Sequence, residues 1–206
     1  MINAKEYYEH GLALHGHKYP AMPMGLRVGA AAMNALGVER AKDGQLLAPV
    51  EPGEDHCATC FADGVQMITS CTFGKGNIRE LHYGKWGVTL VEAATGQPVW
   101  VTPKAEAMLA NKQTEFFREY REKGMPASRV PPEVVEPLVE RVMSAPDENI
   151  LTVSGLFEYE IKPRPHSFSS LVCDGCGEMV VEGYARIVGH RRVCIPCQGT
   201  LIGARE

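Results

Sequence analysis

The chain has 206 residues, of which 25 are acidic and 21 basic, so its formal net charge is −4 at pH 7. This balance argues against a general nucleic-acid-binding protein. No apolar stretch approaches the ~20 residues of a membrane span, and the N-terminus lacks the basic-then-apolar pattern of a secretory signal. The length fits one large domain or one domain with a small module, and we expect a cytoplasmic protein.

The N-terminal segment predicts two helices joined by a loop that contains two histidines. Residues 2–14 and 22–36 read as the helices, and His15 and His17 flank a glycine between them. Spaced in this way, the two histidines can face one ion only if the loop turns sharply, so the residues alone predict one ligand here. The second helix is rich in Gly and Ala, which predicts that another helix packs very close to it. Gly37 fits a helix C-cap.

A cysteine-bearing helix is the next predicted element. Apolar residues recur with the helical period from residue 57 to residue 71, Asp55 fits an N-cap, and Gly74 and Gly76 are expected to end the helix. Cys57 and Cys60 lie one turn apart, so both can reach one metal ion or one substrate. Free first-turn amides also favour a thiolate at Cys60.

Cys71 is excluded from that pair by the geometry of a helix. A continuous helix places it ~16 Å from Cys60 along the axis, at 1.5 Å per residue. We predict instead that the loop from His15 to Tyr19 folds onto the N-terminal end of the cysteine helix. His17 would then lie within metal-sharing distance of Cys60, which requires a separation below ~6 Å.

The remaining core elements predict an α+β fold, with an antiparallel sheet packed with helices. Residues 46–51 read as a strand before the cysteine helix. The expected meander strands are residues 78–82, 86–92 and 98–102, followed by helices over 105–123 and 132–143 and a long alternating strand over 149–161. Residues 163–167 read as a linker. We therefore expect a core domain over 1–165 and a small domain over 166–206.

The small domain contains two C-x-x-C pairs separated by seventeen residues. The cysteines are Cys173, Cys176, Cys194 and Cys197. This spacing predicts one Zn²⁺ ion, or iron in its place, rather than disulfides. Closed four-cysteine sites leave no open coordination position, so this site is expected to be structural. A segment this short cannot bury enough apolar surface to fold alone, and metal binding would supply most of its folding energy.

Several motifs together resemble the FmdE family, whose members are encoded with molybdenum or tungsten formylmethanofuran dehydrogenases. The motifs are His15-Gly16-His17, Pro20, Gly25, Arg27, Gly29, Cys60-x-x-Asp63-x-x-Gln66 and Cys71-Thr72-Phe73-Gly74-Lys75-Gly76-Asn77. The tail resembles the treble-clef zinc finger that some members carry. The resemblance implies an α+β core, often dimeric, with a metal or active site built from His and Cys.

Carried onto this chain, the resemblance makes His17 and Cys60 the leading pair, with His15, Cys57 and Asp63 as neighbours. It implies an accessory metal-binding protein of one-carbon metabolism, linked to methanogenesis. A second transition metal in the core, a homodimer and formylmethanofuran dehydrogenase subunits as partners follow from the same resemblance. The chain departs from the family by having Tyr19 where members usually have Cys before Pro. If that Cys is a ligand, either Tyr19 or Cys57 substitutes for it, or the site is altered.

Two other functions stay open at this point. An independent metal-dependent hydrolase would use an ion bound by His17 and Cys60, with Asp63 as the base. A regulator of the DksA/TraR type would explain the zinc finger, which the tail also resembles. Those regulators pair the finger with a coiled coil, and this sequence has no long heptad hairpin.

Overall fold

The computed structural model describes residues 1–54, 59–155, 157, 159–160 and 168–201. Its contacts divide the chain into two compact units, Met1–Ile161 and Lys162–Glu206. The linker predicted over 163–167 lies outside the described residues, and the predicted boundary after residue 165 stays a prediction. Among the described residues, no helix combines the length and apolar character that a membrane span needs.

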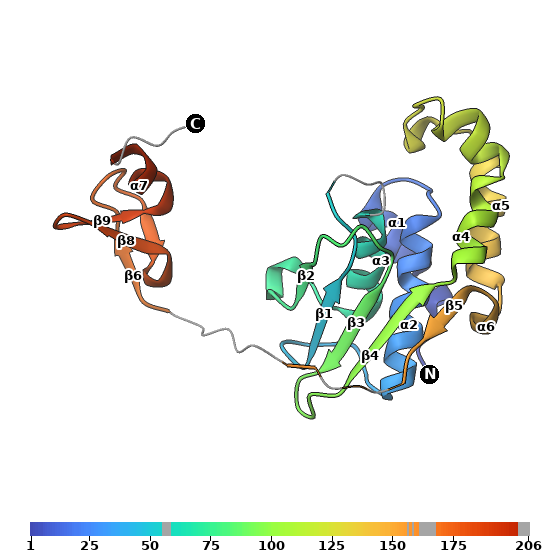
Figure 1. Cartoon of the computed structure of the whole chain (residues 1–206), viewed down its shortest axis with the longest axis horizontal. Helices are drawn as coiled ribbons and strands as arrows, with labels where there is room; N and C mark the ends of the chain where they lie inside the picture. Colours follow the sequence, from blue (N-terminus) through green and yellow to red (C-terminus); the bar gives the residue numbers. More distant parts are fainter. Residues whose placement is uncertain (55–58, 156, 158, 161–167, 202–206) are drawn as a thin grey trace. The chain divides into compact units, whose positions relative to one another are not determined.

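Figure 1 labels the elements along the chain. The helices of the first unit are η1 (Ala4–Tyr7), α1 (Tyr8–His15), α2 (Ala21–Leu36), α3 (Cys60–Thr69), η3 (Phe73–Lys75), α4 (Ala105–Lys112), η4 (Phe116–Arg121), η5 (Ala127–Arg129), α5 (Pro132–Ser144) and α6 (Asp147–Ile150). Its strands are β1 (Leu46–Val50), β2 (Ile78–Glu80), β3 (Val88–Glu92), β4 (Pro98–Pro103) and β5 (Leu151–Val153). The second unit contains β6 (Ser170–Val172), β7 (Met179–Val181), η6 (Glu182–Tyr184), β8 (Ala185–Val188), β9 (Arg191–Cys194) and α7 (Ile195–Leu201).

The five strands of the first unit form one sheet in the order β2-β1-β3-β4-β5. The pairs β1–β3, β3–β4 and β4–β5 are antiparallel, so the predicted α+β class with a helix-packed sheet is confirmed. The prediction of an antiparallel meander was wrong for its first strand, because β2 pairs in parallel with β1, with Ile78 opposite Ala48. Parallel neighbours need a crossover connection, and α3 is that connection.

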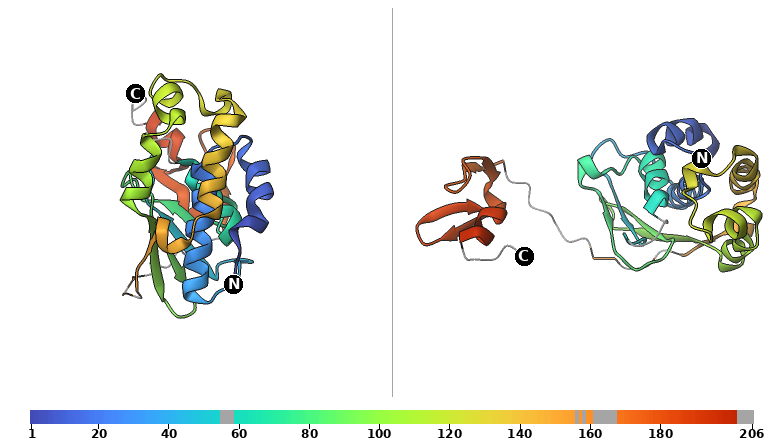
Figure 2. Two further views of the ribbon diagram at one scale, coloured as in Figure 1. Left: turned by 90° about the vertical axis from the view of Figure 1, so that its right-hand side faces the viewer. Right: turned by 90° about the horizontal axis from the view of Figure 1, so that it is seen from above.

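Helix α2 lies in the middle of the unit and packs very closely against α3, as its small residues predicted. A Cβ atom on Gly25 would lie 2.0 Å from the Phe61 carbonyl oxygen, and one on Gly64 would lie 2.1 Å from the Met22 carbonyl oxygen. Seen from above in Figure 2, α1, α2 and α3 lie on one face of the sheet. The main core fills the space between, with Val28, Phe61 and Leu90 among its fully buried side chains.

Helix α3 ends earlier than predicted. It begins at Cys60, after Thr59 in a 3₁₀ conformation, and Asp55 and Cys57 lie outside the described residues. The helix ends at Thr69, ahead of the glycines, because the Thr69 hydroxyl donates to the Val65 carbonyl oxygen at 2.6 Å and accepts from the Cys71 N–H at 3.0 Å. These bonds compete with the helical ladder. Ser70 follows in the left-handed region, with φ of 59°.

Two other elements also differ from prediction. The helix expected over 105–123 is interrupted after Lys112, where the Thr114 hydroxyl donates to the Asn111 carbonyl oxygen at 2.6 Å, and it resumes as the π-helix η4. The strand expected over 149–161 pairs only over Leu151–Val153. The Ser154 N–H still donates to the Trp100 carbonyl oxygen at 2.8 Å, but the backbone N–H of Trp100 donates to the Ser154 hydroxyl at 2.9 Å instead of to a backbone carbonyl, and regular pairing ends there.

The second unit contains two small antiparallel sheets, β6–β7 and β8–β9. Val193 is its fully buried aliphatic residue among those described, and Cys173 is 2% exposed. Several apolar side chains of this unit remain at the surface, with Phe168 at 96% and Met179 at 80% exposure. Such a small apolar core agrees with a module whose folding depends on a metal ion.

Candidate metal centres

The four predicted cysteines of the second unit come together. Cys173 and Cys176 follow β6, Cys194 ends β9, and Cys197 lies in α7. Their sulfur atoms all lie within 4.8 Å of one another. Four thiolates brought together by two knuckles form the ligand set of a structural zinc ion. The predicted four-cysteine cluster is therefore confirmed, and it suits zinc.

Backbone N–H groups prepare Cys173 for the ion. Its sulfur accepts from the Gly175 N–H at 3.3 Å and from the Cys194 N–H at 3.2 Å. Hydrogen bonds from the backbone of Cys176 and Cys194 lower the pKa of Cys173 to about 6, and zinc binds the thiolate form. The Gly177 N–H donates to the Cys173 carbonyl oxygen at 2.9 Å instead of to a sulfur.

In the first unit, the candidate site forms where the end of α1 meets the start of α3. His15 is the last residue of α1, and Gly16 then leaves the helix in the left-handed region with φ of 87°. Cys60 is the first residue of α3, and Asp63 lies in the first turn of that helix. Both helices pack on α2, so the positions of these side chains are set by the core rather than by a loop.

His15 has the most defined geometry in this site. Its side chain is only 7% exposed, and its Nδ1 atom lies 2.8 Å from an Asp63 carboxylate oxygen. The hydrogen bond to Asp63 and then the interaction with Cys60 raise the pKa of His15 to about 9. Its Nε2 atom is buried and has no hydrogen-bond partner of good geometry among the described residues, although the Cys60 side chain lies close enough to raise the pKa of His15. At neutral pH a ring with this pKa carries a proton on Nε2, so a metal ion would bind there by displacing that proton.

His17 lies beside His15, with 4.3 Å between the ring centroids. Burial, followed by the charge of His15, lowers the pKa of His17, so it favours the neutral form that binds metals. Tyr19, which the sequence indicated as a candidate substitute ligand, is 3% exposed. Its ring centroid lies 6.3 Å from that of His17 and 5.7 Å from that of Phe116.

The other predicted site residues fall into two groups. Cys57 lies outside the described residues. Cys71 is fully buried away from the site, with its sulfur 3.6 Å from the Leu46 carbonyl oxygen on β1, and burial raises its pKa to about 11. Within the described residues, His15, His17, Cys60 and Asp63 do not form a set of three whose ligand atoms all lie within 4.8 Å. The predicted His17–Cys60 pair stays a prediction.

A group that sequence reasoning missed is Glu54, Glu80 and His82, whose ligand atoms do lie within 4.8 Å of one another. Glu80 is half-buried and the other two are exposed. Exposed acidic groups commonly gather without an ion, and no buried unpartnered atom points to one here among the described residues. We assign no ligand to this group.

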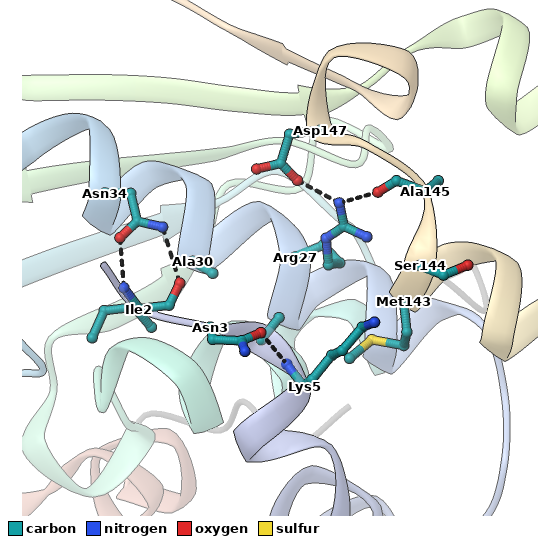
Figure 3. Close-up of a pocket in the computed structure, with 11 residues that line it drawn as sticks. Ile2, Asn3, Lys5, Arg27, Ala30, Asn34, Met143, Ser144, Ala145 and Asp147 are labelled. Carbon is teal, nitrogen blue, oxygen red and sulfur yellow. Dashed lines mark hydrogen bonds and ion pairs between the residues drawn. The ribbon is translucent and has the colours of Figure 1, made fainter.

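Arg27 was singled out by its motif, and the structure gives it a structural role (Figure 3). Its guanidinium donates to the carbonyl oxygens of Val142 and Ala145 and to the Asp147 carboxylate, each at 2.5 Å. Arg27 lines a cavity of about 290 Å³ together with Asn34. Because the charge of Arg27 is paired with Asp147 and its three hydrogen bonds go to residues of α5, α6 and the turn between them, it ties these helices to α2.

Comparisons with known proteins agree with these two units. A solved relative is an FmdE-like protein from Syntrophus aciditrophicus, named after tungsten formylmethanofuran dehydrogenase, with a TM-score of 0.64 and 25% identity over 96% of this chain and 92% of that one. A protein of Archaeoglobus fulgidus, named "Probable S-adenosyl-L-methionine-binding protein", is 28% identical over 97% of this chain and 52% of its own length. The chain thus spans about half the length of this curated relative.

Two family models match, one for each unit. Residues 166–201 match the prokaryotic dksA/traR C4-type zinc finger. Residues 14–152, which are more than half of the chain, match the model described as "FmdE, Molybdenum formylmethanofuran dehydrogenase operon". The second match covers the last two residues of α1, all of α3 and every strand of the sheet except the last residue of β5. The chain belongs to the FmdE family.

Proposed function

We propose that this protein is an accessory metal-binding protein of one-carbon metabolism, with a structural zinc ion in the second unit and a functional transition metal in the first. The family description, which names the molybdenum formylmethanofuran dehydrogenase operon, supports the metabolic link and the association with methanogenesis. The four-cysteine cluster supports the zinc ion.

The buried Nε2 atom of His15 is the observation that carries the core site. Asp63 holds Nδ1 at 2.8 Å, which fixes the ring and leaves Nε2 as the coordinating nitrogen. An Asp–His–metal arrangement of this kind orients the ligand and raises its basicity. Since an unsatisfied buried nitrogen costs about 1–3 kcal/mol, a bound ion also removes a destabilising feature.

Cys60 and His17 are the proposed companions of His15. Cys60 interacts with His15 strongly enough to affect the pKa of His15, and the His17 ring packs against that of His15. Imidazole with a thiolate suits Zn²⁺ or another borderline transition ion. With two or three protein ligands, the ion keeps open positions for a substrate or for water. Asp63 is bonded to His15, so it acts here as a positioning residue, which argues against its role as the base of a hydrolase.

Metal analysis of purified variants tests this proposal. Changing Cys173 and Cys176 to Ser removes the zinc of the second unit, and we expect one transition-metal ion per chain to remain after equilibration with Zn²⁺. Adding His15→Gln to that variant should remove the remaining ion. His10→Gln is the matched control, because His10 is an exposed residue of the same helix. Zinc content that His15→Gln leaves unchanged would contradict the core site.

Membership of the FmdE family also supports a proposal about the partners of the protein. We expect a homodimer formed largely by the first unit, and an association with formylmethanofuran dehydrogenase subunits in the cytoplasm. Light scattering at micromolar concentration tests the dimer, and a monomer mass would overturn it. Co-purification of tagged chain with the dehydrogenase subunits tests the association, with the His15→Gln variant showing whether the core site takes part.

S-adenosyl-L-methionine belongs in the ligand screen because of the name of the Archaeoglobus relative. That name describes a protein about half of which this chain does not match, so the ligand is proposed here only as a candidate. Calorimetric titration of the full chain with S-adenosyl-L-methionine decides the matter. Heat that saturates at one ligand per chain supports binding, and its absence at millimolar ligand removes the candidate.

A further inference from the structure

A second cavity of the first unit has the properties of a small-molecule site. It has a volume of about 360 Å³ and lies among the start of α2, helix α4 and the π-helix η4. Volumes of about 300–1,000 Å³ are typical of pockets that hold small ligands. Unlike the polar cavity at Arg27, this one is lined mostly by apolar side chains.

Aromatic and flexible apolar side chains form its walls. Tyr19, Trp86 and Phe117 provide the rings, and Met24 and Met108 are among the aliphatic lining residues. Flat aromatic walls favour a flat ligand, because stacked and edge-on ring pairs gain about 0.5–1.5 kcal/mol beyond the area they bury. Methionine adapts to ligands of irregular shape.

The opening of the cavity also has an apolar character. Leu109 lines it from α4, although this side chain is 58% exposed to solvent. Phe117 comes from η4, and π-helices occur frequently at functional sites. A ligand that covers Leu109 would remove apolar surface from water, which favours binding.

The polar lining residues indicate which polar group the ligand carries in addition to its apolar part. The Asn111 side-chain oxygen already accepts from Arg141, so the group that Asn111 can offer is its N–H donor. Lys112 adds a positive charge beside it. Asn111 and Lys112 can both donate, and no lining residue carries a carboxylate, which favours a ligand with a negatively charged, hydrogen-bond-accepting end.

We propose that this cavity binds a small, flat, mostly apolar molecule that carries an anionic group such as a carboxylate. The cavity lies beside the His15 site, because Tyr19 contacts the His17 ring and the Trp86 ring lies 6.1 Å from that of Phe61, the residue after Cys60. A ligand bound in this cavity would therefore lie close to the proposed metal ion. Binding to the cavity does not require the ion, so the two proposals can fail separately.

Two fluorescent probes of almost the same shape test the proposal on the full chain. Anilinonaphthalene sulfonate is aromatic, largely apolar and anionic, and phenylnaphthylamine is its neutral counterpart. We expect the sulfonate to bind at one saturable site per chain and to quench tryptophan fluorescence, which comes from Trp86 and Trp100 alone. The neutral probe should bind the same site more weakly.

Two substitutions identify the site. Leu109→Glu should weaken both probes at least ~10-fold, because it replaces the apolar opening with a charge. Leu14→Glu is the matched control, since Leu14 is 54% exposed and does not line the cavity. Lys112→Glu should weaken the sulfonate about 10-fold and leave the neutral probe within about 2-fold, because only the charge beside the probe changes.

Each outcome decides the proposal. Retention of the quenching site in Leu109→Glu, or equal losses in Leu109→Glu and Leu14→Glu, would overturn the cavity as the binding site. Equal effects of Lys112→Glu on both probes would overturn the anionic class. If Leu109→Glu melts more than a few degrees below the parent chain, Lys112→Glu carries the test, because Lys112 is an exposed residue. A change of mass on light scattering without loss of probe binding would assign Leu109 to a contact between chains instead.

Discussion

The four-cysteine cluster and the His15 site show two opposite relations between a metal ion and a fold. In the second unit, the four ligands come from two C-x-x-C pairs, and Cys173 and Val193 are the buried side chains among the described residues. There the proposed zinc ion would supply most of the folding energy. In the first unit, α1 and α3 are positioned by packing on α2 whether or not an ion is bound. There the fold does not depend on an ion, and the ion we propose would keep open coordination positions.

The largest expected effect follows from removing the zinc ligands. Cys173→Ser with Cys176→Ser should unfold the second unit, because structural zinc contributes about 10–16 kcal/mol to small zinc-binding modules at neutral pH. The first unit should keep its thermal transition within a few degrees. Nuclear magnetic resonance of the amides and limited proteolysis report on the two units separately. Met179→Ser, an exposed change in the same unit, is the control. Melting of both units together would contradict the comparison.

The next effect concerns the packing that holds the core site. Gly64→Ala would place a Cβ atom 2.1 Å from the Met22 carbonyl oxygen and 2.6 Å from the Leu26 nitrogen, and backbone atoms cannot move aside locally. Overpacking of this kind costs about 3 kcal/mol, so chemical denaturation should show a clear loss of stability in the first unit. The core metal should bind more weakly, while the zinc ion stays. Gly74→Ala is the control, because its Cβ atom would meet nothing within 4 Å.

Sequence reasoning succeeded where the determining contacts are local or are marked by residue type. The small residues of α2 predicted that another helix packs closely against it, and the structure shows that this helix is α3. The spacing of the two C-x-x-C pairs predicted that their four cysteines cluster, as the structure shows. The parallel pairing of β1 with β2 was missed, because it depends on a crossover through α3 and not on the turn between neighbouring segments.

Within the core site, the sequence indicated the residue types but not their order of importance. The motif favoured His17 with Cys60, whereas the bond from His15 to Asp63 joins residues 48 positions apart and has no local signature. The apolar cavity was missed for the same reason, since its walls come from α2, α4, α5 and η4. The end of α3 was also predicted too late in the chain, because it depends on one threonine hydroxyl, that of Thr69, which competes with the helical hydrogen bonds.

A smaller effect should follow from loosening the proposed metal ligand without removing it. Asp63→Asn keeps an oxygen beside the His15 Nδ1 atom but removes the negative charge. Loss of such a carboxylate partner typically costs 10–100-fold in metal affinity, so competition with a fluorescent chelator should show a loss of about that size. The zinc ion of the second unit should be unaffected. An unchanged affinity would mean that Asp63 holds α1 against α3 and has no effect on the ion.

The smallest effect separates a metal-binding thiol from an ordinary buried one. Cys71→Ala should cost about 1 kcal/mol, because one fully buried sulfur is lost, and it should leave the metal content unchanged. Cys60→Ala should remove the core ion. The two variants therefore differ in metal content although both delete one thiol of the first unit, and metal analysis of the two, side by side, provides the measurement.

The pH dependence of stability provides a second readout for Cys71. Burial raises its pKa from 9.0 to about 11, so in this range the unfolded chain has lost the thiol proton while the folded chain still holds it. Stability therefore falls as the pH rises from 9 towards 11. Denaturation of the parent chain and of Cys71→Ala at several pH values in this range isolates the contribution, because the other titrating groups are common to both. A difference between the two chains that does not change with pH would show that the thiol is not desolvated in solution.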